Sequence, residues 1–206
     1  MATKLWGPLG WMTLHSVSVI YPDTPTFEEK QIAREFLKEF AACISCSICK
    51  DHFTIFLNRY MLTYPSYVDS KRDFFMFVVR AHNDVNRRID KPVISTVSEC
   101  LQLLQSNTQN TTPGEFRQKY MNYLIRNWSY DITADGYIAK QSANKINKIM
   151  NEYFNPRDRD FNLEFPEDST IVFNSTFSSI VPMNNTYVKR TDFFGGFKNG
   201  RIQLFR

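Results

Sequence analysis

The sequence predicts an all-α protein, with seven helices over about the first 154 residues and an irregular or partly extended end. Apolar residues recur at helical spacing in successive segments, and most of these segments follow a Ser or Thr cap. The chain has no G-x-G-x-x-G or P-loop pattern, the usual signs of a nucleotide-binding sheet. With 43% hydrophobic and 22% charged residues in 206, a packed core is expected.

Proline and capping residues mark where the first two predicted helices begin and end. Pro8 suits the first turn of a helix that reaches about Ile20 and stops before Pro22. Thr26 and Glu29 have the spacing of a capping box and open the second helix. The apolar face of this helix is Ile32, Phe36, Phe40 and Cys43.

Three further helices complete the first half. One opens at Cys46 and ends before Pro65, and the fourth is capped by Ser70. A short fifth helix begins after Thr96 and runs through Leu104.

The polar stretch Ser106–Thr112 contains no apolar residue and predicts a boundary between a domain at 1–105 and a second domain at 106–206. After it, Thr112, Pro113 and Glu115 start a sixth helix that reaches about Arg126. A seventh helix is expected from Ala134 to Phe154.

Helical periodicity fades after residue 154. Residues 170–173 and 177–181 are short and rich in β-branched or aromatic residues, so strands or extended segments are possible there. The last twenty residues are basic, and their net charge equals the net charge of the whole chain, +4. A solvated tail is the commoner case, so a nucleic-acid partner is not expected.

No apolar run approaches the ~20 residues of a membrane span, and the N-terminus does not have the pattern of a signal peptide. We therefore expect a soluble, intracellular protein.

The spacing of the cysteines indicates a redox or metal-binding site. Cys43, Cys46 and Cys49 fall within seven residues, whereas Cys100 is distant. Cys46 and Cys49 open a helix, where the partial positive charge of the N-terminus lowers a thiol pKa into the ~3.5–7.5 range of redox cysteines. The spacing lets both sulfurs close a disulfide, with Cys46 the more exposed and Cys49 turned inward.

A structural metal site is the alternative. Cys43, Cys46, Cys49 and His52 are equally spaced and could bind zinc, but on a continuous helix the four would drift halfway around the axis. An iron–sulfur cluster would need Cys100 as a fourth cysteine. The spacing alone leaves the redox pair, the metal site and inert packing open.

Polar residues within the apolar pattern of the fourth helix indicate a bound ligand. His82 and Asn86 share one face, and Asn83 lies beside them. Buried amides need partners, and the cationic Lys91 that follows suits a phosphate. On the first helix, Trp6, Trp11 and His15 offer flat surfaces for an aromatic ring system, although each alone is more often a core residue.

These motifs together resemble the Erv/ALR family of FAD-linked sulfhydryl oxidases over residues 5–100. The matching pieces are Trp6-Gly7-Pro8, Trp11, Leu14-His15, Tyr21-Pro22, Pro25, Cys46-x-x-Cys49, His52-Phe53, His82-Asn83-x-Val85-Asn86 and Lys91-Pro92. The appended second half, which matches no known pattern, and the Asn-, Ile- and Phe-rich composition resemble a mimivirus-type member from the large DNA viruses. Such a member would act in host cytoplasm or virion.

The resemblance implies a four-helix bundle with a short fifth helix, a homodimer, and FAD held without a covalent bond. The implied FAD-site residues are Trp6, Gly7, Trp11, His15, His82, Asn83, Val85, Asn86 and Lys91. In the family's reaction, thiol-containing substrate proteins would reduce Cys46, and electrons would pass through Cys49 to FAD and then to molecular oxygen, giving hydrogen peroxide.

The chain departs from the family pattern at its cysteines. Ile44-Ser45 stands where Tyr-Pro usually precedes the pair, and Val79 stands where many members carry the partner of Cys100. Cys43 is additional, and these residues contain no distant shuttle pair. The resemblance therefore implies that Cys100 lacks its usual partner.

Overall fold

Seven α-helices make up most of residues 3–163, the part of the chain that the computed structural model describes. Their bounds are α1 Thr3–Val19, α2 Phe27–Ala42, α3 Ser47–Thr63, α4 Lys71–Arg88, α5 Val97–Asn107, α6 Pro113–Ser129 and α7 Ala134–Ile149. A π-helical turn, η1 Met150–Phe154, continues α7, and a 3-10 segment, η2 Asn155–Asp160, follows. No strand occurs within residues 3–163, so the all-α prediction is confirmed there. The extended segments predicted at 170–173 and 177–181 lie outside the described residues.

Most helices begin where their capping residues predict. The Oγ1 atom of Thr26 accepts the backbone N–H of Glu29, and the Glu29 carboxylate accepts the backbone N–H of Thr26. Thr112 and Glu115 form the same reciprocal pair at the start of α6. These side chains satisfy backbone groups that a helix end leaves without partners, so they fix the start of each helix.

The start of α1 differs from the prediction. The helix begins at Thr3, so Pro8 lies in its second turn instead of its first. Because proline lacks an N–H group, Pro8 removes one backbone hydrogen bond, the one to the carbonyl four residues earlier. The earlier start makes Trp6 and Gly7 helical residues.

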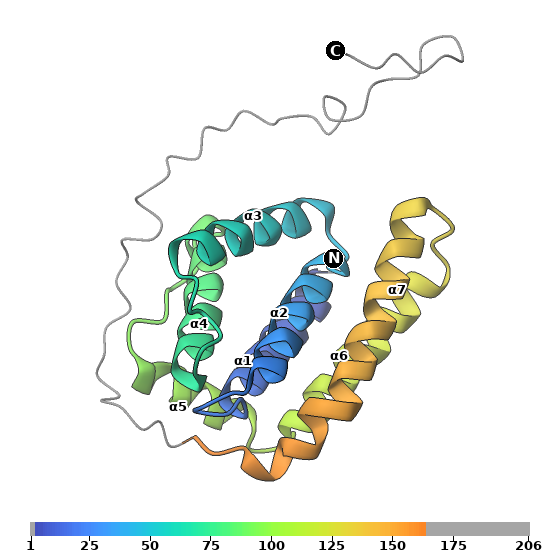
Figure 1. The fold of residues 1–206 in the computed structure, drawn as a ribbon. Helices are drawn as coiled ribbons and strands as arrows, with labels where there is room; N and C mark the ends of the chain where they lie inside the picture. The colour runs from blue at the N-terminus through green and yellow to red at the C-terminus, as the bar shows by residue number, and fades with distance from the viewer. Residues whose placement is uncertain (1–2, 164–206) are drawn as a thin grey trace, which may run out of the picture. The chain divides into compact units, whose positions relative to one another are not determined.

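The helices pack in layers around α1 and α2. Figure 1 shows α4 on one side of this pair and the antiparallel α6 and α7 on the other. In the observed contacts α1 packs against α4 and α6, and α2 packs against α3 and α7. The side of α1 that faces α4 and α5 therefore contributes to the first-half core.

A buried arginine ties α6 to both ends of the described chain. Arg117 is 1% exposed, and its guanidinium donates to Ser16 Oγ at 3.1 Å and to Asn155 Oδ1 at 3.1 Å. It also pairs with the Asp158 carboxylate. A buried charge is tolerated when it is paired and hydrogen-bonded in this way.

The described residues on both sides of the expected 105/106 boundary belong to one compact unit. α5 ends at Asn107, two residues beyond that boundary. Independent folding of residues 1–105 stays a prediction. Within the described part of the chain, no helix is both long and apolar enough to cross a membrane.

Candidate active site

A cavity of about 650 Å³ lies among α1, α2, α3, α4 and α5. Its volume falls inside the ~300–1,000 Å³ range of small-molecule sites. Aromatic side chains contribute much of its wall: Trp6, Trp11, Phe40 and Phe53. The indole Nε1 of Trp6 is buried and has no hydrogen-bond acceptor among the described residues.

One wall of the cavity is a stack of two rings. The ring centroids of Trp11 and His82 lie 4.1 Å apart, and the ring planes differ by 9°. Phe53 of α3 approaches Trp11 at 6.4 Å with a tilt of 58°. Flat, apolar surfaces of this kind suit an aromatic ligand.

A hydrogen-bond chain lies behind this stack. Cys100 Sγ is 3.8 Å from His15 Nδ1, and His15 Nε2 is 2.9 Å from His82 Nδ1. Burial, and then the nearby Glu99, raises the pKa of the Cys100 thiol to about 12, so the thiol keeps its proton at neutral pH.

Burial keeps both rings neutral. It lowers the pKa of His15 well below the usual 6.5, with His82 as a second cause. It also lowers the pKa of His82 to about 4, and the positive charge of Lys91 adds to this shift. The pair therefore acts at neutral pH as a hydrogen-bonding surface without charge.

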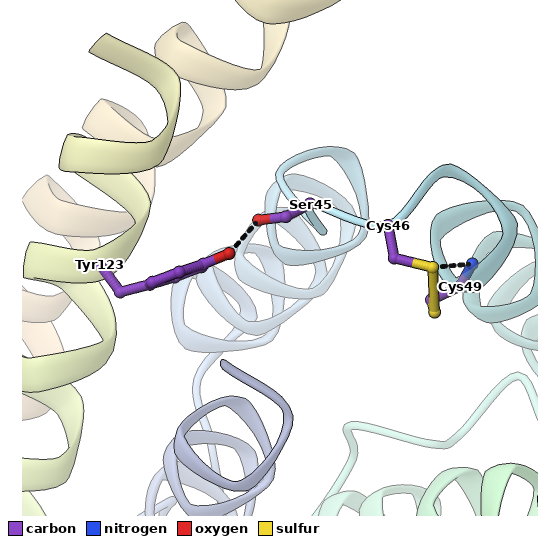
Figure 2. The surroundings of a disulfide bond; sticks show 4 residues. All are labelled: Ser45, Cys46, Cys49 and Tyr123. Carbon is purple, nitrogen blue, oxygen red and sulfur yellow. Dashed lines mark hydrogen bonds between the residues drawn. A yellow bond between two sulfur atoms is a disulfide. The ribbon is translucent and has the colours of Figure 1, made fainter. Parts of the chain in front are cut away.

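Cys46 and Cys49 are joined by a disulfide at the start of α3 (Figure 2). Cys49 lies on the cavity wall, whereas Cys46 does not. Both cysteines are half-buried. The bridge therefore joins a residue of the cavity wall to one that lies outside the lining.

Cys46 is also the N-cap of α3. Its Sγ accepts the backbone N–H of Cys49 at 3.3 Å. A helix N-terminus carries about half a unit of positive charge, so a thiolate released at this position by reduction would be stabilised.

Two asparagines of α4 hold the segment that follows the helix. The side chain of Asn83 donates to Ile94 O at 2.7 Å and accepts from Ile94 N at 2.8 Å. Asn86 Nδ2 donates to Pro92 O at 3.0 Å, and the backbone of Lys91 donates to Asn86 O at 2.8 Å. The chain turns back after α4 at Asp90, whose φ of 54° lies in the left-handed region. Lys91 and Ile94 are thereby brought to the cavity.

The structure gathers most of the predicted site residues around this single cavity. The lining contains Trp6, Gly7, Trp11, His15, Cys49, His82, Val85, Asn86 and Lys91. Asn83 is 2% exposed and does not line the cavity, because both ends of its amide bind Ile94.

Several residues that line the cavity were not predicted from the sequence. Phe40 and Phe53 were predicted only as members of apolar faces or of a motif, and Leu103 and Asn107 carried no signal. The last two reach the cavity because α5 folds back against the rest of the first half. The direction of this connection cannot be derived from helical periodicity.

The cysteine arrangement does not favour the metal site. The sulfurs of Cys46 and Cys49 are bonded to each other, and within residues 3–163 no group of three or more His, Cys, Asp and Glu could hold an ion. Cys43 is a free, buried thiol whose pKa is raised by burial, and its Sγ donates to Phe40 O at 3.4 Å. His52 lies beyond the pair on α3 and does not line the cavity.

Cys100 is likewise free and buried. It shares a core cluster with Val79, the residue expected at the position of its usual partner. The two unpaired cysteines therefore have different surroundings: Cys100 lines the cavity, and Cys43 lies outside it.

Comparison with known proteins connects the first half of the chain to one family. Residues 9–105 match the model of the Erv1 / Alr family. An FAD-linked sulfhydryl oxidase of African swine fever virus (isolate Tick/Malawi/Lil 20-1/1983) is 32% identical over 106 residues, which are 52% of this chain and 85% of that protein. The mitochondrial FAD-linked sulfhydryl oxidase Erv1 of Saccharomyces cerevisiae is 31% identical over 86 residues, 42% of this chain and 43% of that protein.

A protein of Acanthamoeba polyphaga mimivirus is 28% identical over 105 residues, which are 51% of this chain and 72% of the viral protein. No solved structure matches the chain. The relatives therefore include proteins of large DNA viruses, as the resemblance predicted.

Proposed function

The chain belongs to the Erv1 / Alr family and is an FAD-dependent sulfhydryl oxidase, and from that premise we propose that Cys46 and Cys49 form its redox pair. The observation that carries the proposal is the placement of the two sulfurs. Cys49 lies on the wall of a cavity with aromatic and cationic groups, and Cys46 is bonded to it from outside that wall. A disulfide in this position links the protein surface to the cavity.

The residues of the cavity fit flavin adenine dinucleotide (FAD). The stacked Trp11 and His82 supply flat contact area, and Lys91 supplies a positive charge for phosphate. The buried Nε1 of Trp6 is a donor without an acceptor among the described residues, as expected of a group that binds a ligand. Bound FAD would accept two electrons from the cysteine pair and deliver them to oxygen.

The chain's own chemistry is thiol–disulfide exchange. A substrate thiolate attacks Cys46 Sγ, which forms a mixed disulfide, breaks the Cys46–Cys49 bond and releases the Cys49 thiolate. A second substrate thiolate then attacks the substrate sulfur of that mixed disulfide and releases Cys46. The substrate leaves with a disulfide, and its two electrons remain on the cysteine pair.

We propose that Lys91, Trp6, Gly7, Trp11, His15, His82, Val85 and Asn86 hold the cofactor. Asn83 serves the same site by holding the Ile94 backbone, and so acts as a positioning residue. The neutral ring of His82 gives the cavity wall a polar group without charge.

An absorbance spectrum of the purified protein tests the proposal. We expect a yellow protein whose flavin absorbance is bleached by dithiothreitol without oxygen and restored by air, with one disulfide formed for each oxygen molecule consumed. A colourless protein containing one zinc per chain would contradict the proposal and favour the metal-binding module.

Two finer properties follow from the resemblance and belong to the same proposal. We propose that two chains associate as a homodimer, which sedimentation analysis tests, with a monomer at micromolar concentration as the opposing result. From the viral relatives we also propose that the protein acts in host cytoplasm or in the virion. Fractionation of infected cells that places the protein in another compartment would contradict this location.

A further inference from the structure

Large apolar side chains are exposed at the turn that joins α6 to α7. Tyr130 is 84% exposed, Ile132 is 100% exposed, and Tyr137 and Ile138 in the first turn of α7 are 63% and 56% exposed. Single exposed apolar residues are ordinary, but a concentration of them marks an interaction site. We name these four residues the hairpin patch.

Hydrogen bonds hold α6 beside the redox disulfide. Tyr123 Oη donates to Ser45 Oγ at 3.0 Å, next to Cys46 in the chain (Figure 2). Trp128 Nε1 donates to Cys43 O at 3.0 Å. The last turn of α6, just before the hairpin patch, is therefore anchored to the backbone that leads into the redox pair.

The side chain that follows Cys49 also contacts this end of α6. Lys50 Nζ lies 5.7 Å from the centre of the Trp128 ring, within the range of a cation–π contact. Ile48, between the two cysteines, is 51% exposed. Apolar surface is thus available both on the hairpin and within the Cys-Ser-Ile-Cys segment.

We propose that the hairpin patch and Ile48 dock the thiol substrate, and that this substrate is an incompletely folded polypeptide with apolar side chains beside its cysteines. This inference rests on the proposed function. Cysteine is among the residue types most often buried, so reduced cysteines that an oxidase can reach belong mainly to chains that have not finished folding. Such chains also expose the apolar neighbours of those cysteines.

The position of the patch favours a transient occupant. A second copy or another permanent partner bound across the hairpin patch and Ile48 would cover the approach to Cys46 and exclude thiols from it. A substrate that binds through these side chains leaves after the exchange and restores access. The surface therefore fits the molecule that Cys46 must meet.

Kinetics of the full-length holoprotein test the proposal with three dithiols. They are dithiothreitol, a Cys-x-x-Cys peptide flanked by Leu and Phe, and the same peptide flanked by Ser and Gln. In the double variant Tyr130→Ser, Ile132→Ser, we expect kcat/KM for the apolar peptide to fall at least fivefold. Values for dithiothreitol and the polar peptide should stay within twofold of the unsubstituted protein.

Leu62→Ser is the matched control. Leu62 is 85% exposed but lies at the far end of α3, about 22 Å along the helix from its first residue. We expect this variant to oxidise all three dithiols as the unsubstituted protein does.

Several outcomes would overturn the docking proposal without affecting the oxidase function. One is an unsubstituted protein that oxidises both peptides equally well. Others are a double variant with unchanged kinetics for the apolar peptide or with equal losses for all three dithiols. A double variant that turns a dimer into a monomer would mean that the patch serves self-association. A double variant that gains activity on dithiothreitol would mean that residues 164–206, and not a substrate, occupy the patch. An unsubstituted protein that oxidises no dithiol would instead refute the proposed function.

Discussion

His15 Nε2 lies 2.9 Å from His82 Nδ1, although 67 positions separate the two residues in the chain. The contact joins α1 to α4 at the cavity wall. Burial depresses the pKa of both rings, so the folded protein holds them neutral where the unfolded chain would begin to protonate them. Stability is therefore linked to pH through this pair.

We expect the free energy of unfolding to fall as the pH is lowered from 6.5 towards 4.5. The unfolded state binds more protons than the folded state in this window, so acid favours unfolding. The loss of stability that is due to His82 occurs between about pH 6.5 and about pH 4. The loss that is due to His15 continues at lower pH. Each ring contributes a slope of at most about 1.4 kcal/mol per pH unit.

Urea unfolding at several pH values measures this dependence. Above pH 5 both rings lie above their folded pKa values, so they should contribute nearly equal slopes. His15→Gln and His82→Gln should therefore each flatten the profile by a similar amount. A free energy that does not change between pH 6.5 and 5 would contradict the neutral pair.

Substitutions of Cys49 and Cys43 should have different effects on flavin reduction. We expect Cys49→Ser to abolish reduction of the flavin by dithiols, because it removes the sulfur on the cavity wall. Cys43→Ser should retain at least partial turnover, since Cys43 lies outside the cavity and its thiol donates to the Phe40 carbonyl. Its cost in stability should be about 1 kcal/mol.

Anaerobic stopped-flow absorbance with dithiothreitol compares the two variants, and bound flavin per chain is the control for folding. Complete loss of reduction in both variants, with flavin retained, would mean that the redox pair is misassigned.

A third prediction concerns Asn83, which acts through the Ile94 backbone. Asn83→Ala removes two buried hydrogen bonds and should lower stability by about 1–3 kcal/mol. Because Ile94 and Lys91 line the cavity, flavin content after dialysis should fall as well. Asn122→Ala is the control, since that asparagine is exposed on α6 and bonds Gln118. Equal melting temperatures and flavin contents in the two variants would refute the positioning role.

Most helix starts and the Cys46–Cys49 disulfide were predictable from sequence because both depend on local chemistry. Thr26 with Glu29, and Thr112 with Glu115, act through hydrogen bonds that span three residues. The three-residue spacing of Cys46 and Cys49 likewise makes a disulfide possible within one turn.

Long-range contacts escaped the sequence because no local pattern encodes them. Trp128 reaches the Cys43 carbonyl across 85 positions, and Arg117 reaches Ser16 across 101. Asn83 was predicted to face the ligand, since a buried amide needs a partner and helical spacing does not say which one. Its partner is the backbone of Ile94, which lies in the irregular connection after α4.

Independent folding of the first half is the last prediction. All residues that line the cavity lie between Trp6 and Asn107, so a fragment of residues 1–107, with α5 complete, should still bind FAD. The fragment should nevertheless be less stable than the full chain. Removing α6 exposes the surface under Tyr120, which is fully buried and packs so close to Gly10 that an added Cβ would lie 3.4 Å from its ring.

Buried residues of α6 and α7 such as Met121, Leu124 and Ile146 each contribute about 1.5–3 kcal/mol by burial in the full chain. We therefore expect the melting midpoint of the fragment to fall by roughly 10 °C or more. Flavin absorbance and thermal unfolding followed side by side on fragment and full chain measure both effects. A soluble, yellow fragment with a lowered midpoint supports a separate FAD-binding domain. An insoluble or flavin-free fragment would mean that α6 and α7 complete the fold of the first half, because the α1–α2 face cannot remain exposed to water.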